Sequence, residues 1–189
     1  MKAMILAAGY GKRLLPLTKD TPKPLLKVGN KTLIERNINN LIKSGFSEIV
    51  INVSHLSKLV EGHVKEKFPK NNISFSFEER PLGTGGGVLK ALNILGAEPF
   101  LLINSDIYHC ISFMNLPKTT EAAHLIGVPN PDHNRNGDFS IKNENMVEVQ
   151  DGLNELTWSG ISLINPIIFN ENVFDLESFN MWKGVLPCL

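Results

Sequence analysis

Several features that would mark a specialised protein are scarce in this sequence. Its 189 residues include only two cysteines, which cannot form a disulfide framework and which fit a reducing, cytoplasmic compartment. Neither sign of charge prevails, because 19 basic residues balance 19 acidic ones, so we expect neither nucleic acid nor a membrane as a partner. No apolar run has membrane-spanning length, and the one near the N-terminus is too short for a signal peptide.

The composition that remains is that of an ordinary globular protein. Hydrophobic residues make up 42% of the chain and charged residues 20%, which supplies enough apolar surface for a packed core and argues against disorder. At this length we expect a single domain over residues 1–189.

Strand and helix patterns alternate through the first half of the chain. A capping box at Thr32 and Glu35 starts the first expected helix, and Gly45 ends it. The expected strands are 3–7, 49–53, 73–77 and 100–103, and the later helices cover 56–68 and 88–95. This order predicts an α/β fold with a Rossmann-like, mostly parallel sheet and helices on both faces. Ligands of such sheets bind at the carboxyl ends of the strands.

The pattern changes after Asp106. Short candidate strands follow at 124–128, 139–141, 147–149 and 158–164, separated by turn signals such as Asn136-Gly137. We interpret this part as a small antiparallel or mixed β excursion that forms the acceptor side of a cleft.

The first loop has the composition of a phosphate-binding turn. The buried strand that ends at Ala7 leads directly into small residues, which let the backbone come close to a ligand. Three cations, Lys12, Arg13 and Lys23, lie within the next residues. Two common phosphate loops are excluded: Gly11-Lys12 is not followed by Ser or Thr, and a dinucleotide fingerprint would need a third glycine where Leu14 stands.

The spacing that remains is G-x-G-x-R-x-x-P-x-T followed by P-K-P. It is matched by Gly9, Gly11, Arg13, Pro16, Thr18, Pro22, Lys23 and Pro24. This stretch resembles the start of the sugar-1-phosphate nucleotidyltransferases. The alternative is a Gly/Pro-rich surface turn with solvated lysines, which would not require so many fixed positions directly after a strand.

Two further segments suit a nucleotide site. Asp106 follows the fourth strand, where a carboxylate facing bound phosphates would be a natural Mg²⁺ ligand; the alternative is an N-cap. The segment 83–87 reads Gly-Thr-Gly-Gly-Gly and is expected to be a loop before the third helix. By the same resemblance this loop would surround the nucleotide base.

Later motifs narrow the resemblance. Thr84-Gly85-Gly86-Gly87, Gly137-Asp138-Phe139 and the segment 158–162 together resemble the N-acetylmuramic acid-1-phosphate uridylyltransferases of peptidoglycan recycling. The resemblance implies transfer of a nucleotidyl group, from UTP by preference, to a sugar 1-phosphate, with Mg²⁺ as cofactor and release of pyrophosphate. It divides the chain into a nucleotide-binding half, 1–110, and a sugar-binding half, 111–189.

The resemblance also implies the role of each site residue. Arg13 would clamp the triphosphate, Lys23 would lie near the α-phosphate, and Asp106 would hold the metal. The implied nucleotide-binding residues are Leu6, Ala7, Ala8, Gly9, Gly11, Lys12, Arg13, Thr84, Gly85 and Gly86. The implied sugar-binding residues are Asn104, Gly137, Asp138 and Gly160.

One departure from the family pattern leaves the activity open. The family supplies a second metal aspartate from a late segment, and this sequence reaches Leu189 in what reads as a late helix, 182–189, without that segment. We therefore expect either a truncated chain or a metal site that lacks the second aspartate. If another carboxylate completes the site, Asp138 is the first candidate. The alternatives are transfer to another sugar 1-phosphate from another triphosphate, such as guanylyl to mannose 1-phosphate or thymidylyl to glucose 1-phosphate, or a nucleotide-binding module with impaired catalysis.

Overall fold

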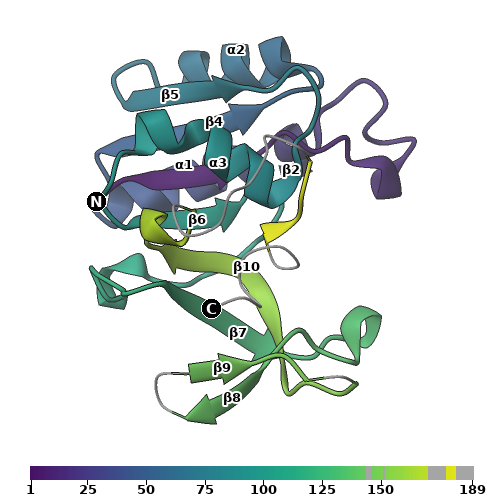
Figure 1. The fold of residues 1–189 in the computed structure, drawn as a ribbon. Helices are drawn as coiled ribbons and strands as arrows, with labels where there is room; N and C mark the ends of the chain where they lie inside the picture. Colours follow the sequence, from purple (N-terminus) through teal and green to yellow (C-terminus); the bar gives the residue numbers. More distant parts are fainter. Residues whose placement is uncertain (144–145, 151, 170–177, 182–189) are drawn as a thin grey trace.

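A six-stranded mixed sheet runs through the whole molecule (Figure 1). The computed structural model describes residues 1–143, 146–150, 152–169 and 178–181. The sheet order is β5 (Asn72–Phe77), β4 (Glu48–Val53), β1 (Ala3–Leu6), β6 (Phe100–Asn104), β10 (Leu156–Ile164) and β7 (Ala123–Pro129). The first four strands are parallel, and β10 is antiparallel to both β6 and β7.

Alternating side chains give the sheet two apolar faces. Ala3 and Ile5 of β1 belong to one buried cluster, with α1 (Leu33–Lys43) and α2 (Ser57–Lys67), whereas Met4 belongs to the other, with α3 (Gly83–Leu95). Each fully buried large side chain contributes roughly 1.5–3 kcal/mol relative to an exposed one, so both faces must be covered. The predicted α/β architecture with helices on both faces is therefore confirmed.

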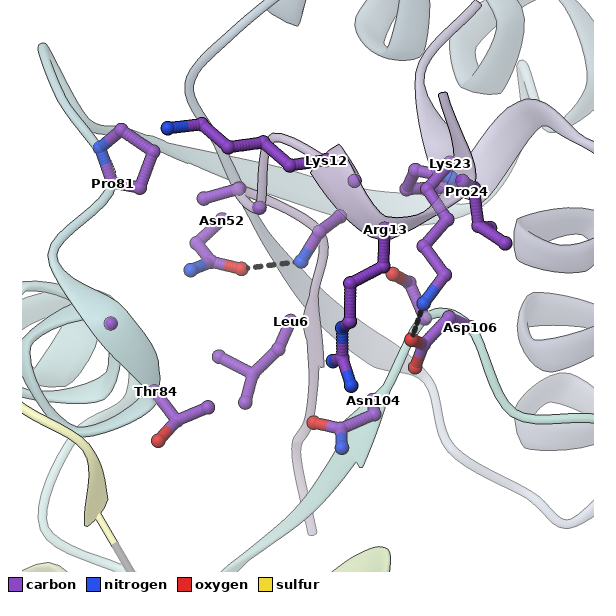
Figure 2. A pocket seen from close by; sticks show the side chains of 17 residues that line it. Leu6, Lys12, Arg13, Lys23, Pro24, Asn52, Pro81, Thr84, Asn104 and Asp106 are labelled. Atoms are coloured by element: carbon purple, nitrogen blue, oxygen red, sulfur yellow. Dashed lines mark hydrogen bonds and ion pairs between the residues drawn. The ribbon is translucent and has the colours of Figure 1, made fainter. Parts of the chain in front are cut away.

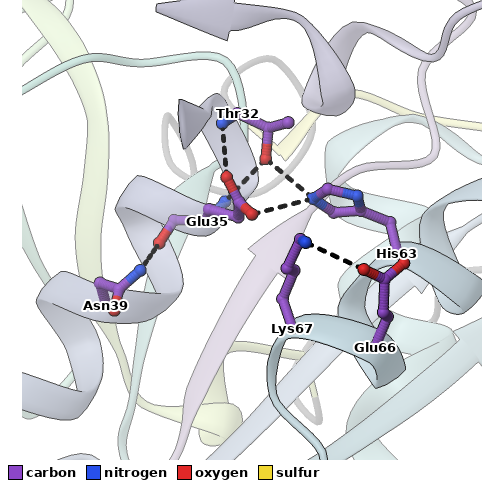
Figure 3. A network of polar contacts seen from close by, with 6 residues as sticks. All are labelled: Thr32, Glu35, Asn39, His63, Glu66 and Lys67. Atoms are coloured by element: carbon purple, nitrogen blue, oxygen red, sulfur yellow. Dashed lines mark hydrogen bonds and ion pairs between the residues drawn. The ribbon is translucent and has the colours of Figure 1, made fainter. Parts of the chain in front are cut away.

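The start of α1 carries the predicted capping box. Thr32 Oγ1 accepts from the Glu35 amide at 3.2 Å, and Glu35 Oε2 accepts from the Thr32 amide at 2.7 Å. Figure 3 shows how α2 joins this network: Nε2 of His63 lies 3.3 Å from Thr32 Oγ1 and 3.4 Å from Glu35 Oε1. These contacts fix α1 against α2 on the same face of the sheet.

The remaining elements are short. Two small antiparallel ribbons are β2–β3 (Lys27–Val28 with Lys31–Thr32) and β8–β9 (Ser140–Asn143 with Met146–Glu148). Single 3₁₀ turns lie at η1 (Lys12–Leu14), η2 (Lys23–Leu25), η3 (Phe113–Asn115), η4 (Asp132–Asn134) and η5 (Pro166–Phe169). The predicted late helix, 182–189, lies outside the described residues.

One sequence-based expectation needs correction. The glycine segment 83–87 is not a loop before a helix, because it forms the first turns of α3 itself. The strands expected after Asp106 do pair antiparallel, and two of the four, β10 and β7, extend the main sheet. Ile161 and Ile164 of β10 are fully buried in opposite clusters, which requires cover on both sides and places the strand inside the sheet.

Among the helices that the structure describes, none is long and apolar enough to cross a membrane.

Candidate active site

A cavity of about 340 Å³ opens at the carboxyl ends of β1, β4 and β6 (Figure 2). Most of its lining was predicted from the sequence: Leu6, Ala7, Ala8, Gly9, Gly11, Lys12, Arg13, Lys23, Thr84, Asn104 and Asp106. The remaining lining residues are Leu14, Pro24, Asn52, Pro81, Gly83 and Ser105. The parallel strands bring these positions together because they all end at one edge of the sheet.

The first loop owes its path to Gly11 and Thr18. Gly11 has a positive φ of 65°, which favours glycine, and Thr18 Oγ1 donates a 2.8 Å hydrogen bond to its carbonyl. A Cβ at position 11 would lie 3.0 Å from Thr18 Cγ2, so the loop closes tightly at this point. The Gly-to-Thr spacing in the sequence therefore records a structural contact that shapes the loop.

Three cations line the cavity. Arg13 is exposed, and its guanidinium extends into the cavity beside Asn104 (Figure 2). Lys12 lies on the opposite side, with its ammonium 5.2 Å from the centre of the Tyr10 ring. Lys23 donates a hydrogen bond to Oδ2 of Asp106. The cavity thus holds three positive charges and one carboxylate, which suits a ligand with several negative charges.

Asp106 is held in place by backbone and amide contacts around its neighbour. The Ser105 amide donates to the Leu6 carbonyl at 3.1 Å, which extends the β1–β6 pairing by one step. Asn37, a buried residue of α1, donates from Nδ2 to the Ser105 carbonyl at 3.1 Å. These two contacts fix the point at which the chain leaves β6, so the carboxylate lies in the cavity beside Lys23.

The glycines of α3 divide into two groups. Gly83 and Thr84 line the cavity at the helix N-terminus, where backbone N–H groups carry partial positive charge. Gly85 and Gly86 are buried and lie outside the cavity lining. A Cβ on Gly85 would lie 2.1 Å from the Phe179 ring, so this glycine allows close packing. Of the three residues of α3 predicted to bind the nucleotide, Thr84 lines the cavity, whereas Gly85 and Gly86 do not.

The predicted sugar-side residues are also split. Asn104 lines the cavity. Gly160 of β10 packs against the Asn104 side chain, since a Cβ at position 160 would lie 2.7 Å from Asn104 Nδ2. Gly137 and Asp138 are not part of the cavity lining. Asp138 instead holds its own turn, because Oδ2 accepts from the Trp158 amide at 2.9 Å and Oδ1 accepts from Asn134 Nδ2 at 3.1 Å.

Two buried polar residues beside the cavity were missed by sequence reasoning. Asn52 Oδ1 accepts from the Ala7 amide at 2.7 Å, and Asn52 Nδ2 donates to Glu78 Oε1 at 2.7 Å. Burial raises the pKa of Glu78, against the opposing effect of its hydrogen bonds from Leu82 and Asn52. An asparagine within the apolar run 49–53 was the one available signal, because a buried strand otherwise has no reason to contain an amide.

The described residues contain no cluster of three or more His, Cys, Asp or Glu side chains that could hold a metal ion. Asp106 contributes a single, partly exposed carboxylate to the cavity. Such a group suits Mg²⁺, which is commonly bound through one or two carboxylates together with substrate phosphates and water.

Comparison with known proteins places this chain in a family of enzymes that transfer nucleotides. Residues 2–149 match the nucleotidyl transferase family, and the chain belongs to that family. The resemblance inferred from the sequence is therefore confirmed.

Individual relatives agree with this assignment. The chain is 40% identical, over 90% of its length and 78% of the relative's, to N-acetylmuramate alpha-1-phosphate uridylyltransferase of Neisseria meningitidis. It is also 40% identical over 57% of its length to mannose-1-phosphate guanyltransferase beta-B of Xenopus laevis, of which it spans only 31%. Its structure matches that of HddC from Yersinia pseudotuberculosis in complex with GMP-PN, with a TM-score of 0.83, 25% identity, and coverage of 100% of this chain and 86% of the other.

Proposed function

We propose that this protein transfers a uridylyl group from UTP to N-acetylmuramic acid 1-phosphate and releases pyrophosphate. The observation that carries the proposal is a cationic cavity at the strand ends, in a chain that is 40% identical over nine-tenths of its length to an enzyme named for this reaction. The product would be a nucleotide sugar that returns cell-wall material to biosynthesis in the cytoplasm.

The reaction is a substitution at phosphorus. An oxygen of the sugar phosphate attacks the α-phosphorus of the triphosphate and forms a new P–O bond. The bond from the α-phosphorus to the oxygen that bridges to the β-phosphate breaks, and that oxygen leaves as part of pyrophosphate. No covalent intermediate on the protein is needed, so positioning and charge neutralisation supply the catalysis.

Each cation of the cavity has a place in this reaction. Arg13 reaches into the cavity with a planar fork that can hold two phosphate oxygens, which suits it to the triphosphate. Lys12 and the first turn of α3 face the same space from the other side. Lys23, beside Asp106, would neutralise charge near the α-phosphate and the incoming sugar phosphate.

The nucleotide would bind along the first loop and the N-terminus of α3. The backbone of this loop passes the cavity at Leu6, Ala7, Ala8, Gly9 and Gly11. The sugar would lie toward Asn104, with Gly160 behind it. In this arrangement residues 1–110 supply most of the nucleotide site, and residues 111–189 supply the acceptor side.

Asp106 is the residue that would hold Mg²⁺. When bound, the ion would offset negative charge on the phosphates and orient them. In the free protein, Lys23 already donates a hydrogen bond to Oδ2 of this carboxylate. Lys23 and a metal ion bound with the nucleotide would therefore compete for the same carboxylate.

A substrate panel tests the proposal. Pyrophosphate release is measured with UTP, GTP, dTTP and CTP, each paired with N-acetylmuramic acid 1-phosphate, mannose 1-phosphate and glucose 1-phosphate, in the presence and absence of Mg²⁺. We expect the highest kcat/KM for UTP with the muramyl phosphate. A preference for GTP with mannose 1-phosphate, as in the name of the Xenopus relative, would instead support guanylyl transfer. Nucleotide binding without turnover of any pair would support a binding module.

A further inference from the structure

A chain of three hydrogen bonds crosses the interior beneath the cavity. The Ala7 amide donates to Asn52 Oδ1 at 2.7 Å, Asn52 Nδ2 donates to Glu78 Oε1 at 2.7 Å, and the Leu82 amide donates to Glu78 Oε2 at 2.8 Å. Both side chains are almost fully buried, with 2% of Asn52 and 5% of Glu78 exposed. The chain therefore links the ends of β1, β4 and β5 to the start of α3.

The direction of every bond in this chain is fixed. Both outer partners are backbone N–H groups, which can only donate, so the atoms that face them must accept. If the Asn52 amide were turned over, Nδ2 would face the Ala7 N–H and Oδ1 would face a carboxylate oxygen. Both contacts would then be repulsive, so the chain admits one arrangement.

Helix α3 is fitted closely over this pair. A Cβ on Gly87 would lie 2.6 Å from Asn52 Nδ2 and 2.8 Å from Glu78 Oε1. Glycine at 87 therefore provides the space that the amide–carboxylate pair needs. Burial raises the pKa of Glu78, because desolvation disfavours the charged carboxylate, and the hydrogen bonds from Leu82 and Asn52 oppose this shift.

The two ends of the hydrogen-bonded chain lead to opposite sides of the cavity. Ala7 itself lines the cavity on the side of the phosphate-binding loop, and Leu82 precedes Gly83 and Thr84, which line it on the side of α3. A nucleoside triphosphate that bridges the cavity must contact both sides at once. Asn52 and Glu78 form a hydrogen-bonded bridge between these two sides.

We propose that Asn52 and Glu78 are positioning residues that hold the first loop and the N-terminus of α3 in the arrangement that binds the nucleoside triphosphate. This inference rests on the proposed function in placing the nucleotide in this cavity. Asn52 lines the cavity, but only 2% of its surface is exposed. Its amide oxygen and nitrogen, like both carboxylate oxygens of Glu78, already bond to the protein, so a positioning role requires no contact with the nucleotide. They act by holding the first loop and the N-terminus of α3 at a fixed position relative to each other.

The alternating donors and acceptors allow an exchange experiment. N52D sets two carboxylate groups against each other, and E78Q sets an NH₂ group against another donor. In the double variant N52D/E78Q the new carboxylate at position 52 accepts from Ala7 and from the new amide at position 78, whose oxygen accepts from Leu82. All three hydrogen bonds are then restored with donor and acceptor exchanged in the middle bond.

We expect each single variant to weaken UTP binding, measured both as Kd and as KM, by about ten- to a hundredfold, the scale of one lost buried hydrogen bond. KM for the sugar phosphate should change less than about threefold, and the double variant should regain most of the UTP affinity. E66Q, the same chemical change on an exposed residue of α2, is the matched control and should leave all constants unchanged.

Amide hydrogen exchange gives a readout that does not depend on activity. The Ala7 and Leu82 amides should exchange slowly in the wild type and the double variant, and faster in the single variants. If wild type fails to turn over UTP but Kd and exchange follow this pattern, the proposed reaction is wrong and the positioning role stands. A folded double variant that regains neither exchange protection nor affinity, or single variants that weaken both substrates equally, would overturn the positioning role.

Discussion

Lys23 and Asp106 form an ion pair inside the cavity, although they come from segments 83 residues apart in the sequence. The lysine begins η2, the turn after the first glycine loop, and the aspartate follows β6. In the free protein, each group partly neutralises the other. A ligand that brings both a metal ion and phosphates can replace this pair with two new ones, since the phosphates attract Lys23 and the metal attracts Asp106.

Removal of the Asp106 charge separates these two effects. In Asp106→Asn, Mg²⁺-dependent turnover should fall by roughly two orders of magnitude or more, because the phosphates lose their metal contact. Binding of metal-free UTP should persist or improve, because Lys23 no longer has a carboxylate competing for it. Initial rates across a Mg²⁺ series and UTP titrations in EDTA measure both quantities. Unchanged dependence of the rate on Mg²⁺ would show that this carboxylate does not hold the metal.

Loss of the Arg13 guanidinium should affect the reaction more than the fold. Arg13→Ala is expected to lower kcat/KM by about two to three orders of magnitude, as when one preorganised charge-stabilising donor is lost. Its exposed position contributes little to the core, so the unfolding midpoint should stay close to that of the wild type. Lys19→Ala removes an exposed cation of the same loop outside the cavity lining and serves as the control. Equal losses of kcat/KM in both variants would show that Arg13 contributes only a general electrostatic attraction for the substrate.

Gly160 offers a test of the acceptor side. Gly160→Ala would introduce a Cβ 2.7 Å from Asn104 Nδ2 at a residue with φ of 85°, so Asn104, which lines the cavity, would have to move. We expect KM for the sugar phosphate to rise by about tenfold or more, while Kd for UTP changes little. Gly62→Ala, on α2 with open space around it, should leave both constants unchanged and raise stability slightly. A rise in Kd for UTP alone would place the nucleotide, not the sugar, beside Asn104.

His109 should make the protein less stable in mild acid. Burial lowers its pKa below the ordinary value, and its Nδ1 accepts from the Ile111 amide at 3.3 Å, which a protonated nitrogen cannot do. The unfolded chain therefore binds a proton at higher pH than the folded chain, so stability falls as pH drops below about 6.5 toward the folded-state pKa. Urea unfolding at several pH values between 7.5 and 5.5 should show a steeper loss for wild type than for His109→Gln. Parallel curves would mean that His109 titrates alike in both states.

Local patterns in the sequence were enough to predict the elements that bear the site. The capping box at Thr32, the first glycine loop and the strand before Asp106 are all encoded by neighbouring residues, and each was found where expected. Most of the cavity lining was listed from the resemblance to the sugar-1-phosphate nucleotidyltransferases. The parallel strands explain why those segments meet, because their carboxyl ends lie at one edge of the sheet.

Distant residues decide the features that the sequence did not predict. The glycine segment was expected to form a loop, but it begins α3, and Phe179, Asn52 and Glu78 occupy the space that side chains at Gly85 and Gly87 would need. Asp138, chosen as a substitute metal ligand because its turn was expected on the acceptor side of the cleft, stays a prediction. Its contacts with Trp158 and Asn134 follow from the paired strands and not from neighbouring residues. Asn52 could not be assigned a role without knowing that Ala7 lies opposite it.

The place of β10 in the sheet has a consequence for the order of folding. β10 is the strand that lies between β6 and β7, yet it is synthesised about fifty residues after β6. Until it leaves the ribosome, β6 has an open edge, and β7 lacks its neighbour in the sheet. Such late, non-local pairing slows folding and exposes strand edges to other chains. A nascent chain should therefore assemble β1 to β6 early and remain a client for chaperones until Ile164 has emerged, since only then is the strand that carries Asn104 enclosed on both sides.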